Sequence, residues 1–186
     1  GSYVFTNQYR PGIEKLFENL AKKYDLYVLS GDNDGERKIL EKLLPNSVTL
    51  VFNQKPEQKL QFIDSLQKQG KNVMMIGDGL NDSGALAQSN VGISISENVN
   101  VFSPACDGIL DASQFNKISF FMNYSKNAMR TIYMSFGLSL LYNTVGLTYA
   151  VSGNLSPIVA AIIMPLSTIT IVSFVTIVTN IYARVK

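Results

Sequence analysis

The stretch from Met74 to Asp82 places two aspartates in a glycine-containing loop directly after a short apolar segment. Gly77 and Gly79 permit sharp turns and close backbone approaches that other residues resist. Asp78 and Asp82 supply carboxylate oxygens, which suit Mg²⁺ because this ion is usually held by one or two carboxylates together with phosphate oxygens. The pattern predicts a magnesium and phosphate site. A simple turn with solvated acids is the alternative.

Apolar segments of strand length alternate with amphipathic helical segments over the first part of the chain. We expect strands at 3–5, 26–29, 48–52, 73–76 and 91–95, and helices that begin near residues 12, 35, 56 and 85. This alternation with short connections predicts a parallel sheet covered by helices. Because parallel strands end at the same edge of a sheet, Ser30, Asp32 and Asp78 should converge, each lying just past a strand.

Two further segments contribute polar groups to this expected edge. Ser30-Gly31-Asp32 follows a strand, although by itself it reads as a polar turn that caps the next helix. Lys59 lies in the first turn of a helix, where a cation is unfavourable for the helix dipole unless it binds an anion. A solvated lysine is the alternative interpretation of Lys59.

The second part of the chain contains no Asp, Glu, Lys or Arg between Thr131 and Ala183. The segments 131–151 and 158–183 each approach the roughly 20 apolar residues that cross a bilayer. Basic residues at both ends of this pair predict that both ends face the cytoplasm: Lys117, Lys126 and Arg130 precede it, and Arg184 and Lys186 follow it. A buried helical pair in a soluble protein is the alternative.

Composition excludes several kinds of chemistry. The 186 residues include no histidine and one cysteine, Cys106, so a disulfide within the chain and histidine acid–base chemistry are both excluded. Cys106 belongs to the charged, soluble part, where a buried structural cysteine is expected rather than a metal ligand. The net charge of +2 gives no indication of nucleic-acid binding.

Three motifs in order resemble the later motifs of the haloacid dehalogenase fold, in the form found in P-type ATPases. They are Ser30-Gly31-Asp32, Pro56-Glu57-Gln58-Lys59 and Gly77-Asp78-Gly79-Leu80-Asn81-Asp82. The resemblance implies a Rossmann-like α/β fold with a partial parallel sheet, followed by an α-helical transmembrane hairpin. It also implies that Mg²⁺ and ATP serve as cofactors of the complete protein.

The same resemblance implies a role for each motif residue. Asp78 would hold Mg²⁺, while Asn81 and Asp82 would support the metal and phosphate. Lys59 would neutralise the transferred phosphoryl group, because phosphoryl transfer depends mainly on positioning and charge neutralisation. Ser30 would donate to a phosphate oxygen, and Asp32 would shape the loop on the nucleotide side. The glycines of the two loops would contribute to cofactor binding: Gly31, Gly77 and Gly79.

The sequence departs from the family pattern in three places. Ser30 stands where the family usually has threonine, and Ser83-Gly84 stands where it usually has Ala-Pro. There is also no Asp-Lys-Thr-Gly-Thr, the segment whose aspartate becomes phosphorylated. We therefore expect a C-terminal part of a pump that cannot turn over alone. Residues 1–114 would be the distal part of a phosphorylation domain, 115–130 a linking helix, and 131–186 two transmembrane helices.

Polar residues within the expected membrane spans are candidates for ion binding. Tyr142-Asn143 and Met164-Pro165-Leu166-Ser167-Thr168 resemble motifs in the last two helices of copper-transporting P-type ATPases, although Thr168 replaces a serine and Pro165 is additional. The resemblance implies that Tyr142, Asn143, Met164 and Ser167 bind the transported ion. A thioether with neutral oxygens suits Cu(I). Simple helix–helix contacts are the alternative role.

These observations predict part of a pump that couples ATP hydrolysis, through an aspartyl phosphate, to transport of Cu(I). We expect an integral protein of the cell (inner) membrane with its soluble domain in the cytoplasm. Its expected partners are membrane lipid, the missing N-terminal part of the same pump and a copper-delivering chaperone. A pump for another cation and a truncated, non-catalytic membrane protein with a phosphate and magnesium site are the alternatives.

Overall fold

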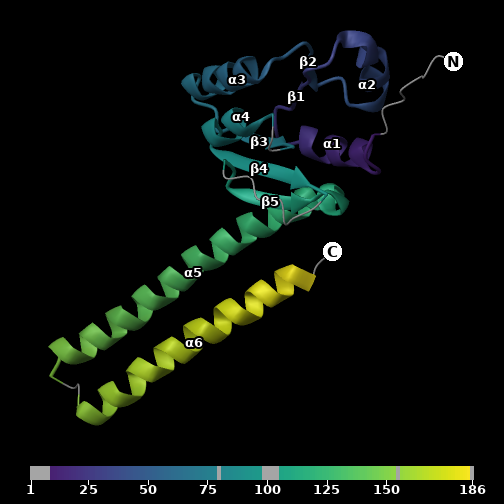
Figure 1. Ribbon diagram of the computed structural model, residues 1–186. Helices are drawn as coiled ribbons and strands as arrows, with labels where there is room; N and C mark the ends of the chain where they lie inside the picture. The colour runs from purple at the N-terminus through teal and green to yellow at the C-terminus, as the bar shows by residue number, and fades with distance from the viewer. Residues whose placement is uncertain (1–8, 79–80, 98–104, 154–155, 185–186) are drawn as a thin grey trace. The chain divides into compact units, whose positions relative to one another are not determined.

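The computed structural model describes residues 9–78, 81–97, 105–153 and 156–184. It divides into two compact units, Gly1–Ser119 and Phe120–Lys186, whose elements are labelled in Figure 1. The first unit contains α1 (Ile13–Ala21), β1 (Tyr27–Leu29), the 3₁₀ helix η1 (Asp34–Glu36), α2 (Arg37–Leu43), β2 (Thr49–Val51), α3 (Pro56–Lys68), β3 (Met74–Gly77), α4 (Ser83–Gln88), β4 (Val91–Ser96), β5 (Gly108–Asp111) and η2 (Ala112–Lys117). Next come α5 (Ile118–Val151), which begins at the end of the first unit, and α6 (Pro157–Arg184).

All strand pairs in the described part of the chain are parallel, as predicted, but the strands described there form two sheets rather than one. β1 pairs with β2, and β4 lies between β3 and β5 in a separate sheet. Ser30 and Asp32 therefore follow a strand of one sheet, whereas Asp78 follows a strand of the other. The apolar pattern predicts that a segment is a strand, but not which strand it pairs with. The predicted strand 3–5 lies outside the described residues, and β5 was not predicted.

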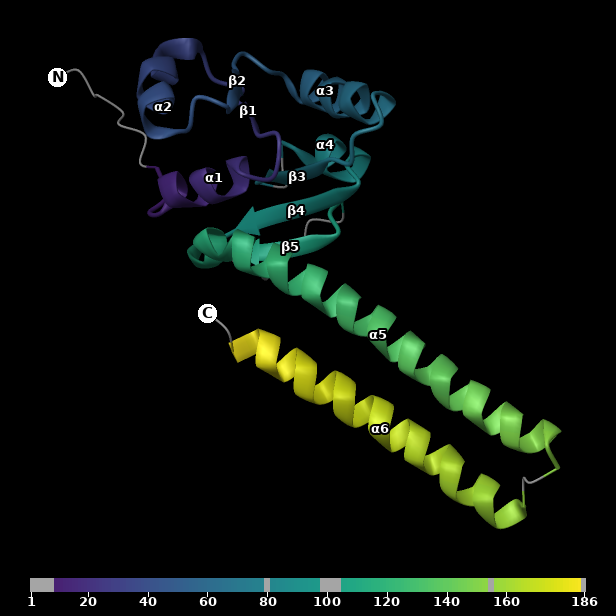
Figure 2. The same cartoon turned by 180° about the vertical axis from the view of Figure 1, so that it is seen from behind.

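Helix α3 packs against α4, which in turn packs against the second sheet. Ile63 of α3 and Leu86 of α4 are buried to 2% and 1% exposure. Figure 2 shows α4 against β3 and β4. A Cβ atom added at Gly92 of β4 would collide with the backbone carbonyl of Leu86. The absence of a side chain at Gly92 therefore allows α4 to lie close to the strand that follows it.

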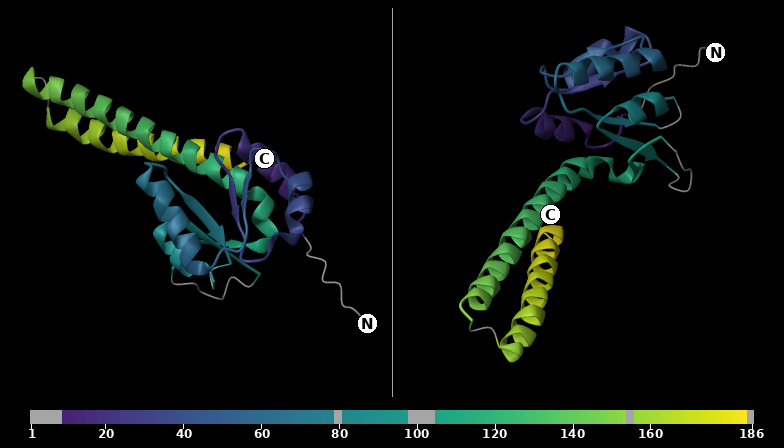
Figure 3. Two further views of the ribbon diagram at one scale, coloured as in Figure 1. Left: turned by 90° about the horizontal axis from the view of Figure 1, so that it is seen from above. Right: turned by 90° about the vertical axis from the view of Figure 1, so that its left-hand side faces the viewer.

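The second unit is a pair of long helices that run side by side, as both views in Figure 3 show. Among the described residues, α6 is the one helix long and apolar enough to cross a membrane, with a mean hydropathy of 2.4 in its most apolar window. The predicted span 131–151 lies within α5, where tyrosines, hydroxyl groups and Asn143 interrupt the apolar residues. That span stays a prediction.

Substitution Gly92→Ala should destabilise the first unit, because the new methyl group meets backbone that cannot move without shifting α4. Overpacking of this kind typically costs about 1–3 kcal/mol. Urea unfolding of the detergent-solubilised chain, followed by circular dichroism, measures the loss. Gly108→Ala in β5 is the matched control, because a Cβ at Gly108 has no heavy atom within 4 Å. Equal unfolding midpoints for the two variants would contradict the packing argument.

Candidate functional site

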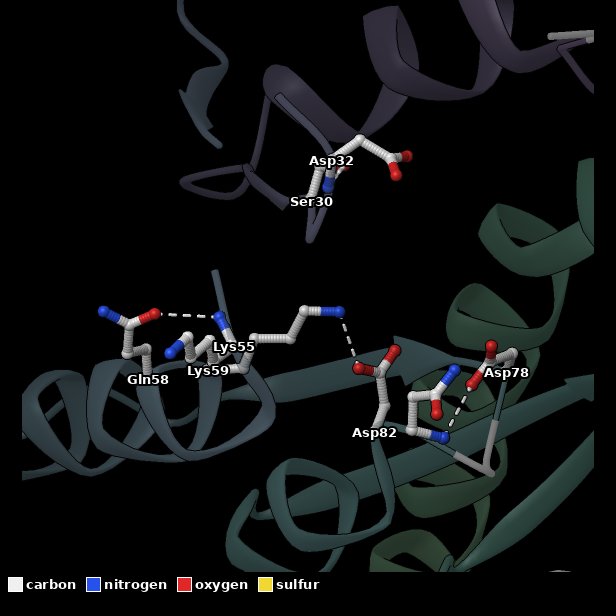
Figure 4. Close-up of polar contacts among 8 residues, drawn as sticks. Ser30, Asp32, Lys55, Gln58, Lys59, Asp78 and Asp82 are labelled. Carbon is white, nitrogen blue, oxygen red and sulfur yellow. Dashed lines mark hydrogen bonds and ion pairs between the residues drawn. The ribbon is translucent and has the colours of Figure 1, made fainter. Parts of the chain in front are cut away.

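A nearly buried ion pair joins α3 to the start of α4. The Lys59 Nζ lies 2.7 Å from the Asp82 Oδ1, and the two side chains are 12% and 11% exposed. Figure 4 shows the Lys59 side chain extended toward Asp82. The first turn of α3 is fixed locally, since Pro56 begins the helix and the Gln58 Oε1 accepts a 2.8 Å hydrogen bond from the Lys55 backbone N–H. Charges this deep in a protein are stable only when paired.

The position of the Asp82 side chain requires a glycine at residue 77. A Cβ atom added at Gly77 would lie 2.6 Å from the Asp82 Oδ2 and 2.9 Å from the Asp82 Cβ. Real side chains do not approach that closely, so a glycine is needed for Asp82 to reach its position beside Lys59. Gly77 at the end of β3 therefore leaves the space in which the Asp82 carboxylate pairs with Lys59, and it also allows the chain to turn.

Asp78 lies at the end of β3 and is exposed, in contrast to Asp82. Its Oδ1 accepts a 3.3 Å hydrogen bond from the Asn81 backbone N–H, which closes the loop between the two aspartates. Gly79, the other predicted loop glycine, lies outside the described residues. No group of three or more Asp, Glu, Cys or His side chains gathers among the described residues. Two carboxylates, one exposed and one paired with lysine, fit Mg²⁺ that keeps water or phosphate ligands.

Ser30 and Asp32 belong to a loop that is tied to the segment after β2. The Ser30 Oγ accepts from the Asp32 N–H at 3.1 Å, and the Ser30 carbonyl accepts from the Gln54 N–H at 2.8 Å. The Asp32 carbonyl accepts from the Asn53 N–H at 2.9 Å. A Cβ added at Gly31 would lie 3.4 Å from the Gln54 carbonyl oxygen, an ordinary contact.

Figure 4 shows Ser30 and Asp32 apart from the Lys59–Asp82 pair. The expected convergence is therefore only partial, because the structure brings Lys59, Asp78, Asn81 and Asp82 together on one side. The role of the second loop in supporting Ser30 was not predicted. Asn53 has a positive φ of 58°, and asparagine tolerates that conformation better than most residues. Asn53 is therefore the residue from which a tight turn after β2 could have been predicted.

A groove between α5 and α6 contains all four residues that the sequence singles out for the transported ion. Its volume is about 340 Å³, and Tyr142, Asn143, Met164 and Ser167 are among its lining residues. Gly146 also lines it and leaves space opposite α6. The Ser167 hydroxyl donates to the Met164 carbonyl at 2.8 Å. A second hollow, of about 220 Å³ beside α2, contains none of the predicted site residues.

Comparison with known proteins finds a matching family model and relatives that are copper-transporting P-type ATPases. A family model described as a haloacid dehalogenase-like hydrolase matches residues 3–90. The probable copper-importing P-type ATPase A of Enterococcus hirae is 30% identical over 92% of this chain and 24% of the relative. The chloroplastic copper-transporting ATPase PAA1 of Arabidopsis thaliana is 31% identical over 87% of this chain and 17% of the relative. The chain thus spans about a quarter or less of the length of these relatives.

Solved structures extend the comparison to the fold. The catalytic CPx-ATPase domain CopB-B is similar with a TM-score of 0.52 and 33% identity, over 59% of this chain and 44% of that one. A zinc-transporting PIB-type ATPase in the E2.Pi state is similar with a TM-score of 0.80 over 93% of this chain and 28% of that one, and its 18% identity bears on the fold alone. The chain therefore belongs to the P-type ATPases and covers part of such a pump, including a haloacid dehalogenase-like domain.

Proposed function

We propose that this chain is part of a P-type ATPase that transports Cu(I), with the first unit acting in phosphoryl transfer and the second in ion binding. The observation that carries the proposal is the groove between α5 and α6, which gathers Tyr142, Asn143, Met164 and Ser167. A thioether and neutral oxygens meet there, and such a set suits a soft monovalent cation.

On the phosphoryl side, Asp78 would hold Mg²⁺ through its exposed carboxylate, with Asn81 in support. Bound Mg²⁺ would neutralise charge on the phosphate oxygens. Lys59 brings a fixed positive charge to the same region, and Asp82 holds that charge in place through the 2.7 Å contact. Ser30 would donate its hydroxyl to a phosphate oxygen, and Asp32 would shape the nucleotide-side loop. Fixed charges of this kind stabilise the transition state of phosphoryl transfer.

The phosphorylated aspartate and the nucleotide-binding domain would come from the rest of the pump. The sequence contains no Asp-Lys-Thr-Gly-Thr segment, and the copper-transporting relatives are several times longer. We propose that 1–114 belongs to the phosphorylation domain, that 115–130 links it to the membrane, and that 131–151 and 158–183 cross a cell membrane with the soluble part in the cytoplasm. A copper-delivering chaperone and membrane lipid are the further proposed partners.

On the ion side, the absence of charged residues between Thr131 and Ala183 favours Cu(I) over a divalent ion. Zn²⁺ in an uncharged groove would leave two positive charges uncompensated in a low-dielectric medium, whereas a carboxylate would offset them. The zinc-transporting structural neighbour keeps a pump for another cation as the second candidate. A non-catalytic protein with a phosphate and magnesium site is the third.

Asp78→Asn in the complete pump should lower Mg²⁺-dependent phosphoenzyme by roughly a hundredfold or more, because the substitution removes the exposed charge that would hold the metal. Acid-stable incorporation of phosphate from labelled ATP measures this level. Asp64→Asn is the control, since Asp64 forms an ion pair with its helical neighbour Lys68 on α3. A normal phosphoenzyme level in Asp78→Asn would remove Asp78 from the proposed site.

Lys59→Met should both destabilise the first unit and impair phosphoenzyme formation. The substitution leaves the Asp82 carboxylate buried without its cation, which should cost about 2–4 kcal/mol of unfolding free energy. Adding Asp82→Asn should recover much of that stability but not the phosphoenzyme. Chemical denaturation and phosphate incorporation report the two effects separately. If the double variant regained phosphoenzyme, Lys59 would have a structural role only.

Met164→Leu should weaken Cu(I) binding by roughly tenfold or more, which corresponds to about 1.4 kcal/mol. Leucine keeps the size and apolar character of methionine but lacks the sulfur. Competition with a coloured Cu(I) chelator measures the affinity of the complete pump. Met134→Leu on α5 is the matched control, because Met134 is also exposed in the helical pair and does not line the groove. Equal effects of the two substitutions would contradict a ligand role for Met164.

A further inference from the structure

One hydrogen-bonded chain connects α5 to α6 beside the groove. The Tyr142 hydroxyl lies 3.2 Å from the Thr170 Oγ1. The Thr170 Oγ1 in turn lies 2.8 Å from the Leu166 carbonyl oxygen, one turn earlier on α6. Tyr142 lines the groove, whereas Thr170 lies outside the motif that predicted the ion-binding residues.

The direction of this chain follows from the chemistry of its members. A backbone carbonyl can only accept, so the single hydroxyl proton of Thr170 must point at Leu166. The Thr170 oxygen is then an acceptor toward Tyr142, and the phenol proton of Tyr142 must point at Thr170. Apolar surroundings strengthen such hydrogen bonds, since little water competes for their partners.

This direction decides what Tyr142 can offer to the groove. A cation is bound by the lone pairs of an oxygen and repelled by its proton. With the proton directed at Thr170, the lone pairs of the phenol oxygen are free for a positive charge. Ser167 has the same polarity, because its hydroxyl donates to the Met164 carbonyl and leaves its own lone pairs available.

We propose that Thr170 is a positioning residue for ion binding, which holds the Tyr142 hydroxyl proton away from the groove so that the phenol oxygen presents its lone pairs to the transported cation. The inference rests on the proposed function of the groove and adds a residue that would not itself touch the ion. Threonine is well suited to the position because its β-branched side chain, bonded to the preceding turn, has little rotational freedom.

Thr170→Val tests this directly, because valine keeps the shape of threonine without its hydroxyl. In the complete pump we expect the Cu(I) dissociation constant and the KM for Cu(I) to rise about fivefold, with kcat nearly unchanged. Thr170→Ser, which restores a hydroxyl, should return both values close to those of the unaltered pump. Thr179→Val is the matched control, since Thr179 makes the same kind of hydroxyl-to-carbonyl bond on α6, at 2.7 Å from the Val175 oxygen.

A double-substitution cycle with Tyr142→Phe separates this role from a general effect on packing. If Thr170 acts through Tyr142, Thr170→Val should change Cu(I) affinity little once the phenol hydroxyl is gone. The same loss of affinity in both backgrounds would overturn the inference, and so would an unaltered affinity of Thr170→Val in the otherwise native pump.

A second measurement tests the Tyr142–Thr170 hydrogen bond itself and does not require a bound ion. The tyrosine doublet in the ultraviolet resonance Raman spectrum responds to whether a phenol donates a hydrogen bond, and the difference between this chain and its Thr170→Val variant should disappear in the Tyr142→Phe background. Absence of that difference would overturn the inference even if the pump binds Cu(I). Its presence in a pump that binds no Cu(I) would instead overturn the proposed function, and the ion-binding role of Thr170 with it.

Discussion

The candidate phosphoryl-transfer site depends on the ion pair between Lys59 and Asp82. Both side chains are almost withdrawn from water, so neither charge is stable without the other. The pair fixes where α4 begins relative to the first turn of α3, and it demands a glycine at residue 77, since any side chain there would overlap Asp82. The exposed Asp78 is left at the end of β3, positioned by the same loop. One electrostatic contact thus positions the lysine cation beside the loop that carries the exposed carboxylate of Asp78.

The sequence was most informative where local signals coincide. Pro56 marked the start of α3, and that start places Lys59 in the first turn of the helix, where it pairs with Asp82. The apolar segment before Gly77 predicted β3, and the structure ends that strand at Gly77 itself. Such features depend on the conformational preferences of a few neighbouring residues, which is why they can be read directly from the chain.

Long-range pairing was much less predictable. Parallel pairing was predicted correctly, but among the described residues β1 pairs with β2 and β3 with β4 in two sheets rather than the one that was expected. Ser30 and Asp78 were expected to converge on the strength of that one sheet. In the second unit, the motifs identified Tyr142, but they gave no reason to single out Thr170, which lies 28 residues away. The contact depends on the register between two helices, and composition does not specify that register.

In the groove between α5 and α6, neutral residues would provide the proposed cation site. The Tyr142 hydroxyl donates its proton to Thr170 and the Ser167 hydroxyl donates its proton to the Met164 carbonyl, so the lone pairs of both oxygens stay available.

The most direct test of the account is phosphoenzyme formation by the purified complete pump with Mg²⁺ and ATP, in the presence of either Cu(I) or Zn²⁺. We predict that Cu(I) stimulates phosphoenzyme formation and Zn²⁺ does not. Stimulation by Zn²⁺ alone would contradict the central claim that the uncharged groove selects a soft monovalent ion.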